Sequence, residues 1–157
     1  MEVRSYQPED AGPLGQVFHR SVRDGAAKRY DAAQVAAWSP KPPAGIAWAE
    51  RLAEADTVVA VEDDVHVGFM SVYDYGYLDL AFVLPEKMGQ GVADMLYAVL
   101  ESRARARGTR RLTTHASLLA EPFFARHGWR LVRRQEVERN GGMLKNAWME
   151  KPLGQAE

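Results

Sequence analysis

The chain has 157 residues, of which 46% are apolar and 26% charged, and its formal net charge is -1. This length predicts one globular domain, residues 1–157, with a core that needs no metal or disulfide to hold it together. Cysteine is absent, which excludes disulfides, thiolate metal ligands and cysteine nucleophiles. The small net charge gives no reason to expect nucleic acid or an anionic membrane as a partner.

The chain begins with charged and alternating residues, and it contains no apolar run suited to a secretion signal or a membrane span. We therefore expect a cytoplasmic location, no membrane association and no bound metal.

The N-terminal third is predicted to be mainly helical after a first short strand. Apolar residues at helical spacing and two capping aspartates define the expected elements. These are a helix carrying Leu14 to Val22 with Asp10 as its cap, a short helix opened by Asp31 that ends before Ser39-Pro40, and a helix from Ile46 to Ala55.

From Thr57 the pattern becomes that of strands, rich in valine. Thr57–Glu62 and Val65–Tyr73 flank Asp63-Asp64, which is typical of a hairpin turn, and a third strand, Tyr77–Leu84, follows Gly76. We expect these three strands to form an antiparallel meander.

The C-terminal half alternates helices and strands. Its longest helix is predicted from an apolar stripe between Val92 and Leu100, with Gly108 as the C-terminal stop of the helix. The expected elements are a helix over Gly91–Arg107, a strand over Leu112–Ala116, a helix over Glu121–His127, and two strands, Trp129–Val137 and Met143–Met149, joined by Asn140-Gly141-Gly142. This order predicts a mixed α/β fold, one sheet with helices on both faces.

The segment between the third meander strand and the long helix has the composition of an anion-binding loop. Gly89 and Gly91 allow a tight turn and close approach of a ligand, and the first amides of the following helix point at an anion. A Walker loop is disfavoured because no Gly-Lys-Ser or Gly-Lys-Thr occurs. The Rossmann fingerprint is disfavoured because Asp94 stands where it needs glycine or alanine. The remaining alternative is an ordinary strand-to-helix turn.

At this loop the sequence resembles the GNAT superfamily of N-acetyltransferases. The family's pyrophosphate motif is Gln/Arg-x-x-Gly-x-Gly/Ala before a long helix, and the run here is Met88-Gly89-Gln90-Gly91-Val92-Ala93, with Met88 in place of Gln or Arg. The resemblance extends to Leu80–Glu86, similar to the family's central strand, and to Ala116–Trp129, similar to its second CoA-contacting helix. Leu78-Asp79, Phe123-Phe124 and the closing Met149–Leu153 are similar to a widespread bacterial subgroup.

The resemblance implies acetyl-CoA as the acyl donor and a twisted, mostly antiparallel sheet of about seven strands flanked by helices. It implies backbone contacts to pantetheine along the central strand and an oxyanion-binding amide near Phe82 to Leu84. The implied cofactor-binding residues are Phe82, Val83, Leu84, Lys87, Met88, Gly89, Gln90, Gly91, Val92, Ala93, Ser117 and Phe124. Arginines from Arg103 to Arg111 could also meet the 3′-phosphate of CoA, although Lys87 is better placed, and Ser117 could equally be a helix cap.

Direct attack of an amine on the thioester needs a base and a proton for the leaving thiolate. Asp79 is the first candidate base and His115 the second, and each could instead be purely structural. Phe124 stands where many relatives carry a general-acid tyrosine, so Tyr73, Tyr75, Tyr97 or water would supply that proton.

Tyr30 and Trp38 lie in the segment that covers the acceptor side in relatives, and they could form an apolar or cation-binding wall or belong to the core. The predicted function is acetyl transfer to an amine of a small molecule or peptide. A homodimer is common among relatives. The alternatives are a CoA-binding sensor without catalysis, suggested by Phe124 and Met88, and a nucleotide-binding interaction domain.

Overall fold

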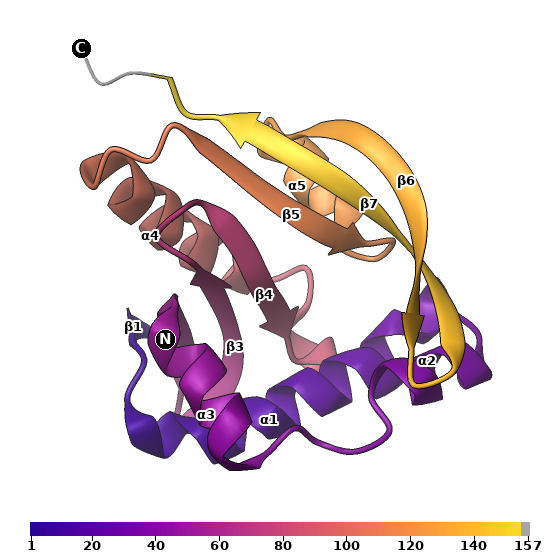
Figure 1. The fold of residues 1–157 in the computed structure, drawn as a ribbon. Helices are drawn as coiled ribbons and strands as arrows, with labels where there is room; N and C mark the ends of the chain where they lie inside the picture. The colour runs from indigo at the N-terminus through magenta and orange to yellow at the C-terminus, as the bar shows by residue number, and fades with distance from the viewer. Residues whose placement is uncertain (155–157) are drawn as a thin grey trace.

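The strands form one seven-stranded sheet in a computed structural model that describes residues 1–154 (Figure 1). The spatial order is β1-β2-β3-β4-β5-β7-β6, and every neighbouring pair is antiparallel except β4 and β5. The strands are β1 Glu2–Ser5, β2 Asp56–Glu62, β3 Val65–Val72, β4 Tyr77–Val83, β5 Arg111–Ser117, β6 Arg130–Arg139 and β7 Gly142–Pro152. The mixed α/β fold and the antiparallel meander are therefore confirmed.

Helices cover both faces of this sheet. They are α1 Ala11–Arg20, α2 Ala32–Trp38, α3 Gly45–Glu54, α4 Val92–Ala106 and α5 Glu121–Arg126. Phe69 of β3 meets Trp48 of α3 with ring centroids 6.2 Å apart, whereas its neighbour Gly68 lies against Val92 and Leu96 of α4. Because successive strand residues point to opposite faces, α3 and α4 lie on opposite sides of the sheet. No helix among residues 1–154 is both long and apolar enough to cross a membrane.

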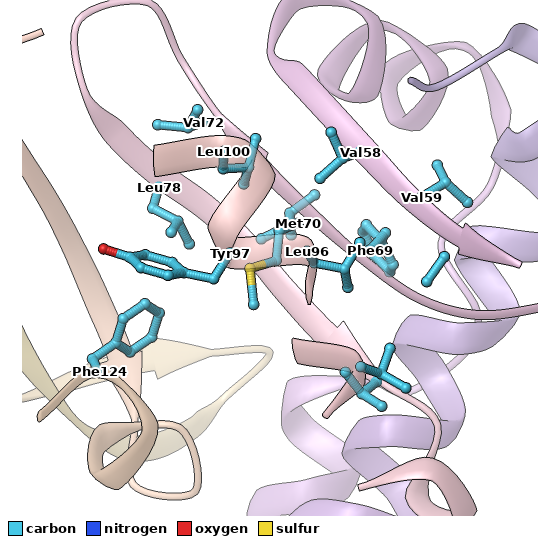
Figure 2. Close-up of a cluster of buried hydrophobic side chains, with 14 of the residues drawn as sticks. Val58, Val59, Phe69, Met70, Val72, Leu78, Leu96, Tyr97, Leu100 and Phe124 are labelled. Carbon is cyan, nitrogen blue, oxygen red and sulfur yellow. The ribbon is translucent and has the colours of Figure 1, made fainter. Parts of the chain in front are cut away.

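The core beneath α4 joins the two halves of the chain. Figure 2 shows Leu96, Tyr97 and Leu100 of α4 beside Met70 and Leu78 from the sheet, and each of these side chains is at most 3% exposed. Phe124 of α5, 1% exposed, belongs to the same cluster. Full burial stabilises such an apolar side chain by about 1.5–3 kcal/mol, so α4 anchors both the meander and α5.

The two predicted caps behave differently. Asp31 caps α2 as expected, because its carboxylate accepts a hydrogen bond from the Gln34 amide at 2.8 Å. Asp10 stands at the N-cap position of α1, but its side chain forms no capping hydrogen bond there, so the predicted role is wrong. Its buried carboxylate instead accepts hydrogen bonds from both Nη atoms of Arg4 at 2.8 Å and contacts His66 Nε2 at 2.7 Å.

This cluster fixes the charge of Asp10. Burial opposes ionisation, but the hydrogen bonds from Arg4, His66 and the Gln7 amide outweigh it and hold the pKa of Asp10 well below its usual range. The carboxylate therefore ties β1, the start of α1 and β3 together.

Both predicted hairpin turns are present. Asp63 and Asp64 have φ of 51° and 63°, and Asn140 and Gly141 have φ of 50° and 82°, as a two-residue turn of primed type requires. Gly142, expected in the second turn, is instead the first residue of β7.

The β6–β7 hairpin tip is fixed to α2, beside which it lies in Figure 1. Asn140 Nδ2 donates to the Ala37 carbonyl at 2.6 Å, and Gln34 Nε2 donates to the Met143 carbonyl at 3.1 Å. A Cβ on Gly142 would lie 2.5 Å from Ala37 Cβ, so only glycine permits this close approach.

Strands β4 and β5 separate after a short parallel contact, as Figure 1 shows. They pair only at Tyr77–Thr113 and Leu78–Thr114. On the other side of β4, Ser71 pairs with Leu80 and Val72 with Leu78, so Asp79 is the extra residue of a β-bulge. The second half of β4 thus has a free edge facing a gap.

Candidate active site

A cavity of about 490 Å³ lies at this gap, between β4, the glycine loop and α5. All the predicted cofactor-binding residues line it except Leu84 and Gln90. Residues that were not predicted to bind cofactor or substrate also contribute to its wall: Ser21, Val22, Ala26, Met70, Ala81, Asp94, Leu119, Ala120, Phe123 and Arg126.

The glycine loop has the conformation expected of an anion cradle. Gly89 and Gly91 have φ of +76° and +85°, in the left-handed region that favours glycine, and nothing lies within 4 Å of where a Cβ would stand on either. Gly91 immediately precedes α4, whose first amides have no carbonyl partner within the helix. The open backbone and the helix N-terminus together suit a diphosphate.

Side chains around the loop are engaged with the protein itself. A Cβ on Gly25 would lie 2.6 Å from Met88 Cε, so Met88 packs on the segment after α1. Gln90 Nε2 donates to the Glu86 carbonyl at 2.8 Å, and Lys87 Nζ lies 3.0 Å from Glu62 Oε2. The loop therefore presents mainly backbone to the cavity.

The free edge of β4 presents selected backbone groups. The Leu84 amide donates to the Val67 carbonyl at 2.9 Å, which removes it as an oxyanion donor. In the alternating antiparallel ladder, Ala81 and Val83 then belong to non-hydrogen-bonded pairs and point their amides away from β3. Consistently, the Val83 carbonyl accepts from Ser21 Oγ at 2.5 Å rather than from β3.

A second cavity of about 290 Å³ shares part of its wall with the first. The residues that line both are Trp38, Ala81, Phe82, Ser117, Ala120 and Phe124. The two cavities therefore lie side by side where β4 and β5 have separated. Asp79, His115 and Tyr30, all singled out from the sequence, line the second cavity.

Asp79 is paired with an arginine that the sequence analysis did not identify. Arg51 of α3 donates from Nε to Asp79 Oδ2 at 2.7 Å and from Nη2 to Oδ1 at 2.9 Å. This hydrogen-bonded carboxylate raises the pKa of Arg51, so the guanidinium stays protonated. Both Asp79 oxygens are engaged, and its side chain is only 11% exposed.

His115 lies on β5 with its Nδ1 3.2 Å from the Tyr77 hydroxyl. Partial burial, then the charges of Arg139 and Arg133, lower the pKa of His115 below the usual 6.5. The ring is therefore neutral at physiological pH. Burial and the Asp79 charge raise the pKa of Tyr77, which keeps its phenol protonated.

The tyrosines proposed as a general acid lie elsewhere. Tyr73, Tyr75 and Tyr97 line neither cavity. The Tyr97 hydroxyl donates to Glu101 at 2.6 Å and accepts from Trp129 Nε1 at 2.9 Å. Tyr77 is the tyrosine near His115, and its position two residues before Asp79 on the same strand was the available signal.

The two predicted acceptor-side aromatics both reach the second cavity. Tyr30 is also structural, since its hydroxyl donates to the Lys145 carbonyl at 2.5 Å and accepts from the Leu118 amide at 2.9 Å. Trp38 stands between Tyr30 and Phe82, with ring centroids 5.5 and 6.2 Å away.

Ser117 lies at the cavities and also forms a turn. It lines both cavities, and its Oγ accepts a hydrogen bond from the Ala120 amide at 3.1 Å, as in a helix-capping turn.

The arginines from Arg103 to Arg111 line neither cavity. Arg103 and Arg107 bind Asp56, at 2.7 and 3.1 Å, so they serve the far end of α4 instead. Arg126 is the arginine that reaches the first cavity, 3.0 Å from Asp94. Within residues 1–154, no group of three or more histidine, aspartate or glutamate side chains is arranged to hold a metal ion.

Comparison with known proteins now decides the family. Residues 26–151 match the model of the acetyltransferase (GNAT) domain. The chain belongs to the GNAT acetyltransferases. It is 35% identical over 150 residues to the uncharacterised N-acetyltransferase YafP of Escherichia coli K12, covering 95% of this chain and 94% of that protein.

Solved GNAT structures agree with this assignment. A GCN5-related N-acetyltransferase from Rhodopseudomonas palustris is 35% identical, with a TM-score of 0.91 over 97% of this chain and 95% of that one. Phosphinothricin acetyltransferase from Sinorhizobium meliloti, solved with acetyl-CoA, shares the fold at 21% identity and a TM-score of 0.73, over 98% and 88% of the two chains. This GNAT protein is thus an N-acetyltransferase.

Proposed function

We propose that this GNAT enzyme transfers an acetyl group from acetyl-CoA to an amine of a small molecule or peptide. The donor would occupy the first cavity and the acceptor the second. The observation that carries this proposal is the shared wall of the two cavities at the gap between β4 and β5. A donor and an acceptor bound on the two sides of that gap meet in one place.

Donor binding follows from the backbone of the first cavity. The amides around Gly89, Gly91 and the start of α4 would hold the diphosphate, and the free β4 edge at Ala81 and Val83 would pair with the pantetheine amides like an added strand. Phe82 and Phe124 would pack on the apolar part of the arm. Bound acetyl-CoA supplies the acetyl thioester, whose C–S bond breaks as the C–N bond to the amine forms.

His115 is the base that we propose for the acceptor amine. It is neutral at physiological pH and faces the second cavity. With Nδ1 protonated and donating to the Tyr77 oxygen, Nε2 keeps a lone pair for the amine proton. Asp79, the first candidate from the sequence, comes second because both its oxygens already accept from Arg51.

The remaining roles fall to backbone and solvent. The Val83 or Ala81 amide would stabilise the negative oxygen, and water or the Tyr77 phenol would return a proton to the thiolate. Phe124 cannot donate a proton, so its ring would only keep the reacting centre dry.

The test combines binding and turnover on the purified chain. Calorimetry should show binding of acetyl-CoA, with ATP and NAD as controls that do not bind comparably. Thiol release and the mass of the product should then show acetylation of at least one member of a primary-amine panel. Tight binding of acetyl-CoA with no acetylated amine across a broad panel would contradict the proposal and favour a non-catalytic sensor.

A further inference from the structure

The charges around the second cavity indicate which kind of amine it accepts. We propose that the acceptor carries an anionic group, such as a carboxylate, besides its amine, and that Arg139 binds this group. This inference rests on the proposed function, since it assumes that the second cavity holds the acceptor.

The charged residues that line the second cavity are Arg51, Asp79, Arg139 and Lys145. Arg51 and Asp79 neutralise one another. Lys145 is exposed, whereas its neighbours Leu144 and Asn146 are buried. Its side chain therefore points away from the cavity, to the other face of β7. Arg139 remains as a cation that forms no ion pair within residues 1–154.

Arg139 is held where it can meet a ligand. It pairs with Gly142 at the end of the β6–β7 hairpin, whose tip is hydrogen bonded to α2 through Asn140. Its only side-chain hydrogen bond with a described residue is to the neighbouring Glu138 carbonyl, at 2.9 Å. Its guanidinium therefore has free donors for a carboxylate, in the paired geometry that arginine favours.

A second polar group in the same wall lacks a partner. Asn146 is 9% exposed, and its Oδ1 accepts no hydrogen bond from any residue from 1 to 154. It pairs with Ser117 across the β5–β7 ladder, so it lies beside the point where the two cavities meet. A buried carbonyl oxygen without a partner is costly, and a hydrogen-bond donor of the acceptor molecule would satisfy it.

The charged residues that line the second cavity also disfavour a polycationic acceptor. A diamine would need a free carboxylate for its second ammonium group, and the sole acidic residue in the wall, within the part of the chain described, is Asp79, which Arg51 already binds. Arg133, stacked over Trp148 at 5.0 Å, adds positive charge close to His115. The field over this cavity therefore attracts anions and repels cations.

The experiment uses matched primary amines of equal chain length: amino carboxylates, alkylamines and diamines. We expect kcat/KM to be about tenfold or more higher for the amino carboxylates, the size of a charge-assisted hydrogen bond. Arg139→Gln should raise KM about tenfold for amino carboxylates but leave the alkylamines nearly unchanged, and Arg139→Lys should recover part of the loss. The assays are run at a pH well above the ordinary histidine pKa, so that His115 is neutral in every variant and its charge does not change KM.

Arg110→Gln is the matched control, because Arg110 is exposed and lines neither cavity. It should leave every KM unchanged, and circular dichroism should show that all variants fold. A preference for alkylamines or diamines, or an equal effect of Arg139→Gln on all amines, would overturn this inference while acetyl transfer itself stands. Acetyl-CoA binding without acetylation of any amine would instead overturn the proposed function, and this inference with it.

Discussion

Replacing Gly91 by alanine tests the glycine loop most directly. Gly91 has φ of +85°, and nothing lies within 4 Å of the place where a Cβ would stand. The substitution therefore strains the backbone without a clash inside the protein. A left-handed alanine costs about 1–2 kcal/mol, so the free energy of unfolding should fall by that amount.

The loss of acetyl-CoA binding should be larger than this backbone strain explains. The new methyl group would occupy space that we assign to the diphosphate, which would displace hydrogen bonds to a charged ligand worth about 1.5–3 kcal/mol each. We expect KM for acetyl-CoA to rise about tenfold or more, with a parallel loss in calorimetric affinity. Urea denaturation measures the strain, and steady-state kinetics at varied acetyl-CoA measures the binding.

Gly108→Ala provides the matched control. Gly108 follows the other end of α4 with φ of +84°, also has nothing within 4 Å of its Cβ position, and lines neither cavity. It should lose a similar amount of stability and keep the parent KM. Equal changes of KM in the two variants would refute the placement of the diphosphate at Gly91.

Three further predictions concern the base, the buried carboxylate and the shared wall. His115→Gln should lower kcat about 100-fold or more and abolish the fall of kcat at acidic pH, which in the parent should lie below the usual histidine pKa of 6.5. Asp79→Asn should lower kcat by a smaller factor. If Asp79→Asn instead lowered kcat more and abolished the acidic limb, Asp79 would be the base. Asp10→Asn should lower the free energy of unfolding by about 3–5 kcal/mol. Urea denaturation as pH falls below 3.8 should show that the parent loses more stability than the variant, because the Asp10 carboxylate, whose pKa is lowered in the fold, stabilises it only while ionised. Phe124→Ala should cost about 3–5 kcal/mol in the same assay, and a loss below about 1 kcal/mol would contradict its place in the core.

Local patterns were sufficient to predict the elements and the glycine loop. Apolar spacing located the helices, and the positive φ of Asp63 and Asn140 follows from turn chemistry that adjacent residues determine. The Asp10 side chain was predicted to cap the first helix, whereas it binds Arg4 and His66. Local sequence does not reveal these partners because they reach Asp10 only when β1 and β3 have assembled around it.

The acceptor side depended on contacts between distant parts of the chain. Arg51 meets Asp79 only because a bulge interrupts the β3–β4 ladder, and no periodicity signals that pairing. Arg139 reaches the second cavity because the hairpin tip rests on α2, a contact that needs Gly142 opposite Ala37. Single-sequence reasoning cannot supply such geometry.

The brief contact between β4 and β5 also bears on how such enzymes diverge. The glycine loop follows β4, whereas His115, Arg139 and Asn146 come from β5, β6 and β7, and β4 and β5 pair at only two residue positions. Mutations in the later strands can accumulate without disturbing the loop. A lineage built on this plan can thus inherit one cosubstrate unchanged while its descendants exchange one amine for another.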